Sequence, residues 1–156
     1  MQWLAALTLI LCSNLVHAAG QNLTIPSHPL WKEECSSCHI AFPPQLLAAE
    51  NWGQLMNGLD KHFGVNASID IKDAKGILEF LQRNAGKDAR YSASSLKVSD
   101  TRWFKREHSD IASRTWTDPL VKSRSNCTAC HVKAEQGDWS ERGVKMPAGL
   151  YRQDDD

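Results

Sequence analysis

The pattern Cys-x-x-Cys-His occurs twice in this chain, as Cys35-Ser36-Ser37-Cys38-His39 and as Cys127-Thr128-Ala129-Cys130-His131. It is the attachment signature of a c-type haem. Both thiols of such a motif form thioether bonds to the vinyl groups of the porphyrin, and the histidine that follows binds the iron as its proximal ligand. The sequence therefore predicts two covalently attached haem c groups. The predicted attachment residues are Cys35, Cys38, Cys127 and Cys130, and the predicted proximal ligands are His39 and His131.

Other uses of a Cys-x-x-Cys pair fit this sequence less well. Four of the five cysteines fall in the two motifs. A zinc ribbon places its two cysteine pairs about 15–20 residues apart, and Cys38 and Cys127 are separated by far more than that. A thioredoxin-like site needs one such pair beside a βαβ pattern, which the sequence does not show. A disulfide within each pair would leave His39 and His131 unexplained. Haem attachment is therefore favoured over zinc binding and over redox-active thiols.

The N-terminus predicts export across a membrane. Leu4–Leu11 is an apolar run too short to span a bilayer. The Val16-His17-Ala18 stretch that follows has the small residues of a signal-peptidase site. We expect a signal peptide over residues 1–19, cleaved after Ala18 or Ala19, and a periplasmic mature protein. No second apolar run of membrane length follows, so no membrane span is expected in the mature chain.

The fold class indicated by the sequence is mainly α, arranged as two haem domains. We expect residues 20–92 to form an N-terminal haem c domain and residues 93–156 a second, small domain of helical and irregular structure. The stretch from Gly86 to Asp100 is polar, rich in serine and without hydrophobic periodicity, which is typical of a link between domains. Two haems are expected to form much of the core themselves.

Hydrophobic periodicity predicts two helices in the first half of the chain. The first begins with Asn51 as its N-cap and Gln54 as the capping-box partner, and it ends at Gly64. The second is capped by Asp70, carries apolar residues at helical spacing, and ends at Asn84-Ala85-Gly86. We expect the second helix to pack against the first haem.

Two further helices are predicted in the second half. Thr101–Ser113 has helical periodicity and places Phe104, His108 and Ile111 on one face. The Asp118-Pro119 pair suits the N-cap and first position of another helix, because proline has no amide hydrogen to leave unpaired there. That helix is expected to run into the second haem motif.

Each iron needs a second axial ligand, and the expected mature chain has three histidines outside the motifs, namely His28, His62 and His108. His62 lies on the apolar face of the first predicted helix, and His108 shares a face with Phe104. The alternative for each is a packed or capping histidine near a helix end. With two haems to ligate, we favour His62 and His108 as distal ligands. We expect His28 to lie at the surface or to bond a haem propionate.

Methionine is the other common distal ligand, and Met56 and Met146 are the candidates. Met56 lies among the apolar residues of the first predicted helix. Met146 precedes Pro147 and has no helical context. We therefore favour bis-histidine ligation at both irons over histidine–methionine ligation. Because a methionine ligand raises the reduction potential, this choice implies a carrier of comparatively low potential.

Beyond the motifs, the chain resembles the periplasmic dihaem cytochrome c family, the DHC type that serves as redox partner of a small high-spin haem protein. The resemblance covers nearly the whole expected mature chain. The stretches around His62 and His108 are more specific than the haem motifs, which many families share. The resemblance rests on His28-Pro29-Leu30-Trp31, Phe42-Pro43-Pro44-Gln45-Leu46-Leu47, Trp52 to Met56, Asp60-Lys61-His62-Phe63-Gly64, Trp103-Phe104-Lys105-Arg106-Glu107-His108 and Asn126-Cys127-Thr128-Ala129-Cys130-His131.

The resemblance implies an N-terminal domain similar to small cytochromes c and a less typical C-terminal domain. It implies two low-spin bis-histidine haems in close contact, with His62 and His108 in the distal roles. Chain locality suggests His62 for the first haem and His108 for the second. The implied function is one-electron transfer and not catalysis. Another cytochrome or haem protein is the expected acceptor, and a membrane b-type cytochrome is a possible donor.

Partners of other classes are not expected, and three other haem functions remain as alternatives. Basic and acidic residues balance at 18 each, which gives no signal for nucleic-acid binding. The small dihaem subunit of a periplasmic reductase has motifs much closer together than these. A gas-binding haem protein needs one labile distal ligand. A dihaem peroxidase needs an open iron and a chain about twice as long. Whether protein ligands block both irons distinguishes an electron carrier from a gas-binding protein or a peroxidase.

Overall fold

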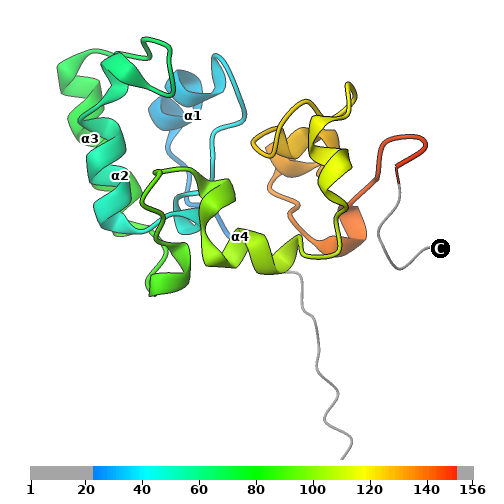
Figure 1. Ribbon diagram of the computed structural model, residues 1–156. Helices are drawn as coiled ribbons and strands as arrows, with labels where there is room; N and C mark the ends of the chain where they lie inside the picture. The colour runs from blue at the N-terminus through cyan, green and yellow to red at the C-terminus, as the bar shows by residue number, and fades with distance from the viewer. Residues whose placement is uncertain (1–22, 151–156) are drawn as a thin grey trace, which may run out of the picture.

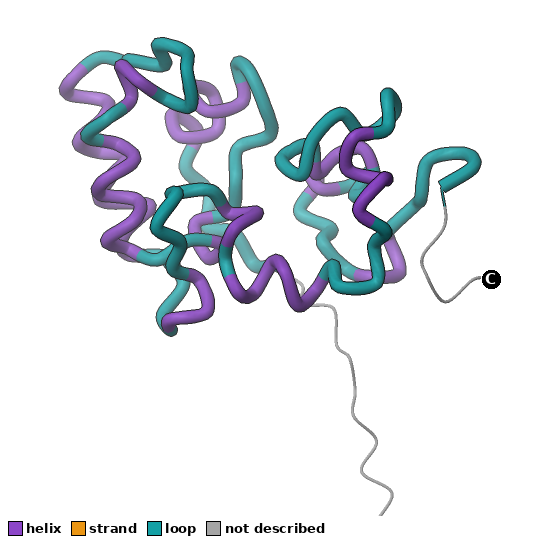
Figure 2. The backbone as a smooth tube through the Cα atoms, viewed as in Figure 1, coloured by secondary structure: helices purple, strands orange, loops and turns teal. Residues whose placement is uncertain are grey.

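The computed structural model describes residues 23–150, and within that range the regular structure is helical, with isolated β-bridges and no strand. Figure 1 shows two lobes side by side: one holds α1, α2 and α3, the other holds the chain after α4, and α4 lies between them at the base. Short helices and long loops alternate throughout (Figure 2). The mainly α prediction is confirmed. The predicted signal peptide lies outside the described residues.

Helix α1 (Pro29–Ser36) leads into the first Cys-x-x-Cys-His motif. It begins at His28, whose ring Nδ1 accepts a hydrogen bond from the amide of Trp31 at 3.0 Å, while Pro29 occupies the first helical position. His28 therefore has a capping role that the sequence analysis did not assign to it. The last turn of α1 carries Cys35, so the helix ends within this motif.

Helix α2 (Ala49–Met56) differs from the prediction at both ends. It begins before Asn51, which is buried inside the helix and exchanges two side-chain hydrogen bonds with the backbone of Ala93, at 3.1 and 3.2 Å. The predicted N-cap at Asn51 was therefore wrong. The helix also ends well before Gly64. A 3-10 helix, Leu59–Lys61, follows it, so His62 lies on the next turn and not on a helix face.

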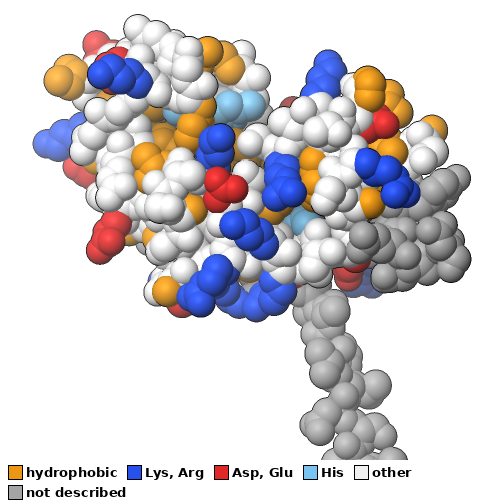
Figure 3. All heavy atoms as spheres, in the orientation of Figure 1, with side chains coloured by type: hydrophobic (Ala, Val, Ile, Leu, Met, Phe, Trp, Pro, Cys, Tyr) orange, Lys and Arg blue, Asp and Glu red, His pale blue; other side chains and the backbone are white. Residues whose placement is uncertain are grey.

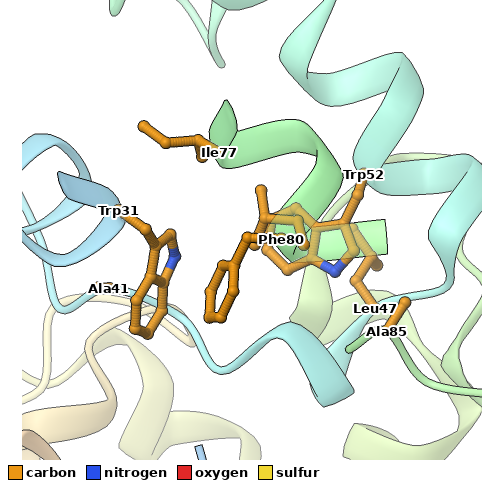
Figure 4. Packing of buried hydrophobic residues seen from close by; sticks show 8 residues of the cluster. Trp31, Ala41, Leu47, Trp52, Ile77, Phe80 and Ala85 are labelled. Carbon is orange, nitrogen blue, oxygen red and sulfur yellow. The ribbon is translucent and has the colours of Figure 1, made fainter. Parts of the chain in front are cut away.

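Helix α3 (Ile71–Arg83) follows the prediction closely. The Asp70 carboxylate accepts a hydrogen bond from the amide of Lys72 at 2.8 Å, and the helix ends at Asn84. Its apolar face packs against α1 and α2 (Figure 4). The buried residues of this first-lobe core are Trp31, Ala41, Leu47, Trp52, Ile77, Phe80, Leu81 and Ala85.

The segment predicted to link the two domains, which starts at Gly86, packs against the first lobe. The amide of Gly86 donates to the carbonyl of Leu47 at 2.9 Å, and the amide of Ala48 donates to the carbonyl of Tyr91 at 3.1 Å. With the Asn51–Ala93 pair, these bonds fasten the segment to the start of α2. The division of the chain near residue 92 stays a prediction.

Gly86 has no room for a side chain, which gives a stability prediction. An added Cβ would lie 2.5 Å from Cγ of Tyr91, whose side chain is buried. Gly86→Ala is therefore expected to lower the free energy of unfolding by about 1–3 kcal/mol, as overpacking does in a filled core. Gly76, inside α3, has nothing within 4 Å of its ideal Cβ and serves as the control. Gly76→Ala is expected to raise stability by up to about 1 kcal/mol. Denaturant unfolding of the holoprotein measures both, and equal effects would contradict the prediction.

Helix α4 (Arg102–Glu107) begins at the predicted place but is shorter than predicted. The Thr101 hydroxyl accepts a hydrogen bond from the amide of Phe104 at 3.1 Å and caps the helix. The predicted extension to Ser113 was wrong, because the helix ends at Glu107 with His108 as its C-cap. The chain then continues as loops joined by short 3-10 helices. These are Ser113–Thr117, Cys127–Ala129, Ala134–Gln136 and Glu141–Gly143.

The helix predicted from Asp118 does not form. The Asp118 carboxylate does cap the amide of Leu120 at 2.8 Å, as an N-cap would. The amides of Val121 and Lys122 then both bond the Asp118 carbonyl, and the backbone of Lys122 turns to a φ of 70°. A left-handed conformation ends helical propagation, so the capping signal produces a single turn.

Candidate haem sites

The first candidate site brings His39 and His62 together. His39 follows the end of α1, and His62 opens a tight turn in which Phe63 and Gly64 have φ of 48° and 97° and the amide of Val65 donates to the His62 carbonyl at 3.0 Å. The two rings lie 6.1 Å apart between centroids, with 25° between their planes. His39 is exposed and His62 is partly buried. Burial, and then the neighbouring His39, lower the pKa of His62, which favours the neutral imidazole that ligation needs.

The second candidate site brings His108 and His131 together. Their ring centroids are also 6.1 Å apart, but the planes are inclined by 67°. The His108 ring stacks on Phe104 at 4.1 Å with an interplanar angle of 17°, and Trp116 meets it edge-on at 5.9 Å. Residues 23–150 thus contain two facing histidine pairs, and each pair includes one motif histidine.

The spacing within both pairs fits an iron atom between the rings. Metal–imidazole bonds are about 2.0 Å long, so two histidines on opposite sides of one iron have ring centres about 6 Å apart. The tautomers suit this arrangement as well. Nδ1 of His108 lies 2.9 Å from the Phe104 carbonyl, and Nδ1 of His39 lies 2.7 Å from the Ile40 carbonyl. A carbonyl oxygen only accepts, so both Nδ1 atoms carry the hydrogen, and Nε2 is left without one, as a metal-binding nitrogen must be.

An apolar pocket surrounds the second pair. Both lobes contribute to its lining, since Leu46 comes from the first lobe and Val121 from the second. Met146 also lines this pocket, whereas Met56 packs against the first-lobe core. Trp116 and Trp139 line it too. Neither tryptophan is among the site residues predicted from the sequence. In Figure 3, histidine side chains reach the surface in both lobes.

The motif cysteines are all free thiols, which suits attachment of haem. Burial, and then the charge of Glu34, raise the pKa of the Cys35 thiol to about 11. Burial raises the pKa of Cys127 to about 12. Both thiols are therefore expected to stay protonated at neutral pH when nothing is bound to them. The described part of the chain also has no group of three or more His, Cys, Asp or Glu placed to hold a metal ion.

Comparison with known proteins assigns the chain to a family. Residues 31–139 match the family model described as dihaem cytochrome c. This chain belongs to the dihaem cytochrome c family. It is 40% identical to the crystal structure of DHC purified from Rhodobacter sphaeroides, covering 72% of this chain and 97% of that one with a TM-score of 0.63. The diheme cytochrome type c from Shewanella baltica OS155 is 36% identical, with coverages of 83% and 99% and a TM-score of 0.70. No curated protein matches.

Membership settles the cofactor and the general function. A dihaem cytochrome c carries two covalently attached c-type haems and transfers electrons to and from a redox partner. The resemblance stated from the sequence is therefore confirmed. Among residues 23–150, no helix is long and apolar enough to cross a membrane.

Proposed function

We propose that this dihaem cytochrome is a periplasmic one-electron carrier and not an enzyme, with both irons held by two histidines. Cys35 and Cys38 attach the first haem (haem 1), and Cys127 and Cys130 attach the second (haem 2). His39 and His62 are the axial ligands of haem 1, and His131 and His108 are those of haem 2. The observation that carries the proposal is the pair of histidine–histidine separations, both 6.1 Å.

The chain's own residues keep each site suited to electron exchange. The haems supply the ferric–ferrous couple when bound. His39 and His108 are oriented by carbonyl hydrogen bonds, so their rings need not reorient when the charge of the site changes. A second histidine opposite each motif histidine leaves no open position for a peroxide or a gas. This arrangement favours the carrier over the peroxidase and gas-binding alternatives.

The proposed partner is another haem protein as acceptor, with a membrane b-type cytochrome as a donor. We also propose residues 20–92 and 93–156 as two domains with one haem each. Phe63 and Val65, beside His62, are 52% and 61% exposed. An apolar surface next to a ligand histidine suits a small, transient contact at the edge of haem 1.

Electron paramagnetic resonance of the ferric protein tests the ligation. The angle between two imidazole planes sets the splitting of the iron orbitals that overlap with them. The nearly parallel rings at haem 1, 25° apart, are expected to produce a rhombic low-spin signal. The steeply inclined rings at haem 2, 67° apart, are expected to produce a low-spin signal of much larger anisotropy. Two low-spin signals of different type, in equal amounts, are the expected result.

A high-spin ferric signal from either haem would contradict bis-histidine ligation at that iron. A histidine–methionine site is distinguished by the near-infrared charge-transfer band of the sulfur–iron bond. That band should be absent from the wild-type spectrum.

A further inference from the structure

Trp139 has a buried hydrogen-bond donor for which the described part of the chain supplies no acceptor. Its indole Nε1 has essentially no solvent exposure and no hydrogen-bond partner. The side chain lines the haem 2 pocket, with its ring 5.5 Å from the ring of His131. Folded proteins pair nearly all of their buried N–H groups. A donor at this place therefore indicates an acceptor that arrives with whatever fills the pocket.

The loop around Trp139 is built to keep the indole in place. The Asp138 carboxylate accepts hydrogen bonds from both the amide and the hydroxyl of Ser140, at 3.0 and 2.6 Å. These two bonds lower the pKa of Asp138, the hydroxyl contributing most, so the carboxylate stays ionised. Gly137 precedes the turn with a φ of 84°, and an added Cβ on Gly143 would lie 2.9 Å from the Asp138 carboxylate. This hydrogen-bonded turn restricts the position of the indole, so Nε1 cannot turn toward another acceptor in the protein.

A haem c offers only one kind of acceptor for such a donor. Its macrocycle, methyl groups and thioether bridges are apolar, and its four pyrrole nitrogens bind the iron. The two propionates are its hydrogen-bonding groups. We propose that the Nε1 hydrogen of Trp139 bonds a propionate of haem 2, which makes Trp139 a positioning residue that also sets the potential of this haem. The proposal rests on haem 2 occupying the pocket and does not depend on the distal ligand.

The sign of the effect on the potential follows from charge. A hydrogen bond to an ionised propionate draws negative charge away from the iron. Without that bond, more negative charge stays close to the iron and stabilises the ferric state. Losing the Trp139 donor is therefore expected to lower the reduction potential of haem 2, because hydrogen bonding near the haem is one of the means by which a protein sets it.

The test compares Trp139→Phe with Trp116→Phe in the two-haem protein. Trp116 lines the same pocket, but its Nε1 does not belong to the buried polar atoms that lack a hydrogen-bond partner. A redox titration followed by NMR of the haem methyl signals, assigned through contacts with Cys127 or Cys35, reports each haem separately. At a fixed applied potential within the redox transition of haem 2, Trp139→Phe is expected to raise the ferric-to-ferrous ratio of this haem about threefold or more. Haem 1, and both haems of Trp116→Phe, are expected not to shift.

A measurement on the wild-type protein covers the case in which Trp139→Phe fails to mature. The indole hydrogen of Trp139 should show a nuclear Overhauser contact to the propionate methylene hydrogens of haem 2, together with slow exchange with solvent. Absence of that contact, or a haem 2 potential unchanged by Trp139→Phe, would overturn the proposal and point to a buried water as acceptor. Failure of the bis-histidine proposal would appear instead in the ferric spin state, which these readouts do not use.

Discussion

Replacing His108 with alanine is expected to convert haem 2 from low-spin to high-spin while haem 1 stays low-spin. His108 is held more firmly than His62. Its ring stacks on Phe104 at 4.1 Å, and its Nδ1 bonds the Phe104 carbonyl at 2.9 Å, within a pocket lined by apolar side chains. Removing the ring takes away both the ligand and the group that fills the distal side. Carbon monoxide should then bind one of the two reduced haems, whereas the wild-type protein should bind none.

His62→Ala is the matched control for His108→Ala. It should open haem 1 alone, and because His62 lies at a partly exposed turn, water can enter the vacant position. The large-anisotropy resonance signal should vanish from His108→Ala and the rhombic one from His62→Ala. If His108→Ala lost the rhombic signal and His62→Ala lost the large-anisotropy signal instead, the pairing of ligands with haems would be wrong. A low-spin haem 2 in His108→Ala would identify another ligand, with Met146 in the same pocket as the first to examine.

Local signals in the sequence predicted the start of a helix better than its end. Asp70 and Thr101 cap α3 and α4 as expected, because an N-cap depends on contacts within three residues. Asn51 misled the prediction because its amide bonds Ala93, a partner far along the chain that no local pattern reveals. Asp118 made the correct capping bond, yet the turn it opens ends at Lys122. A tertiary contact decided the outcome at Asn51, and the backbone conformation of Lys122 decided it at Asp118.

The two haems could be predicted from the motifs alone, whereas the distal ligands were chosen for a helix face that the structure does not have at His62. The Cys-x-x-Cys-His pattern requires no fold to be recognised, and family membership confirms the two haems. His62 was chosen for its place on a helix face, but the helix ends before it and a turn brings it opposite His39. Nothing in the local pattern distinguishes Trp116 or Trp139, because the sequence around each of them has no hydrophobic periodicity to separate pocket residues from surface ones.

The combined change Cys127→Ala and Cys130→Ala is expected to leave a protein with one haem and an unfolded C-terminal lobe. After His108, the buried hydrophobic residues among those described are Ala112, Val121 and Ala134, which together bury little apolar surface. Short 3-10 helices make few bonds that resist opening. The walls of the haem 2 pocket therefore have little to pack against except the haem itself, much as small metal-dependent domains depend on their metal.

Hydrogen exchange measured by mass spectrometry tests this expectation. Amides of residues 109–150 should lose their protection in the Cys127→Ala, Cys130→Ala variant, while those of α3 should keep theirs. The matched variant, Cys35→Ala with Cys38→Ala, should behave differently. The first lobe has its own core of Trp31, Leu47, Trp52, Phe80 and their neighbours, so α3 should stay partly protected even without haem 1. Retained protection of residues 109–150 after loss of haem 2 would show that this lobe folds through its own contacts. Haem 2 would then bind a pocket that is already folded, and it would not be the core around which the lobe folds.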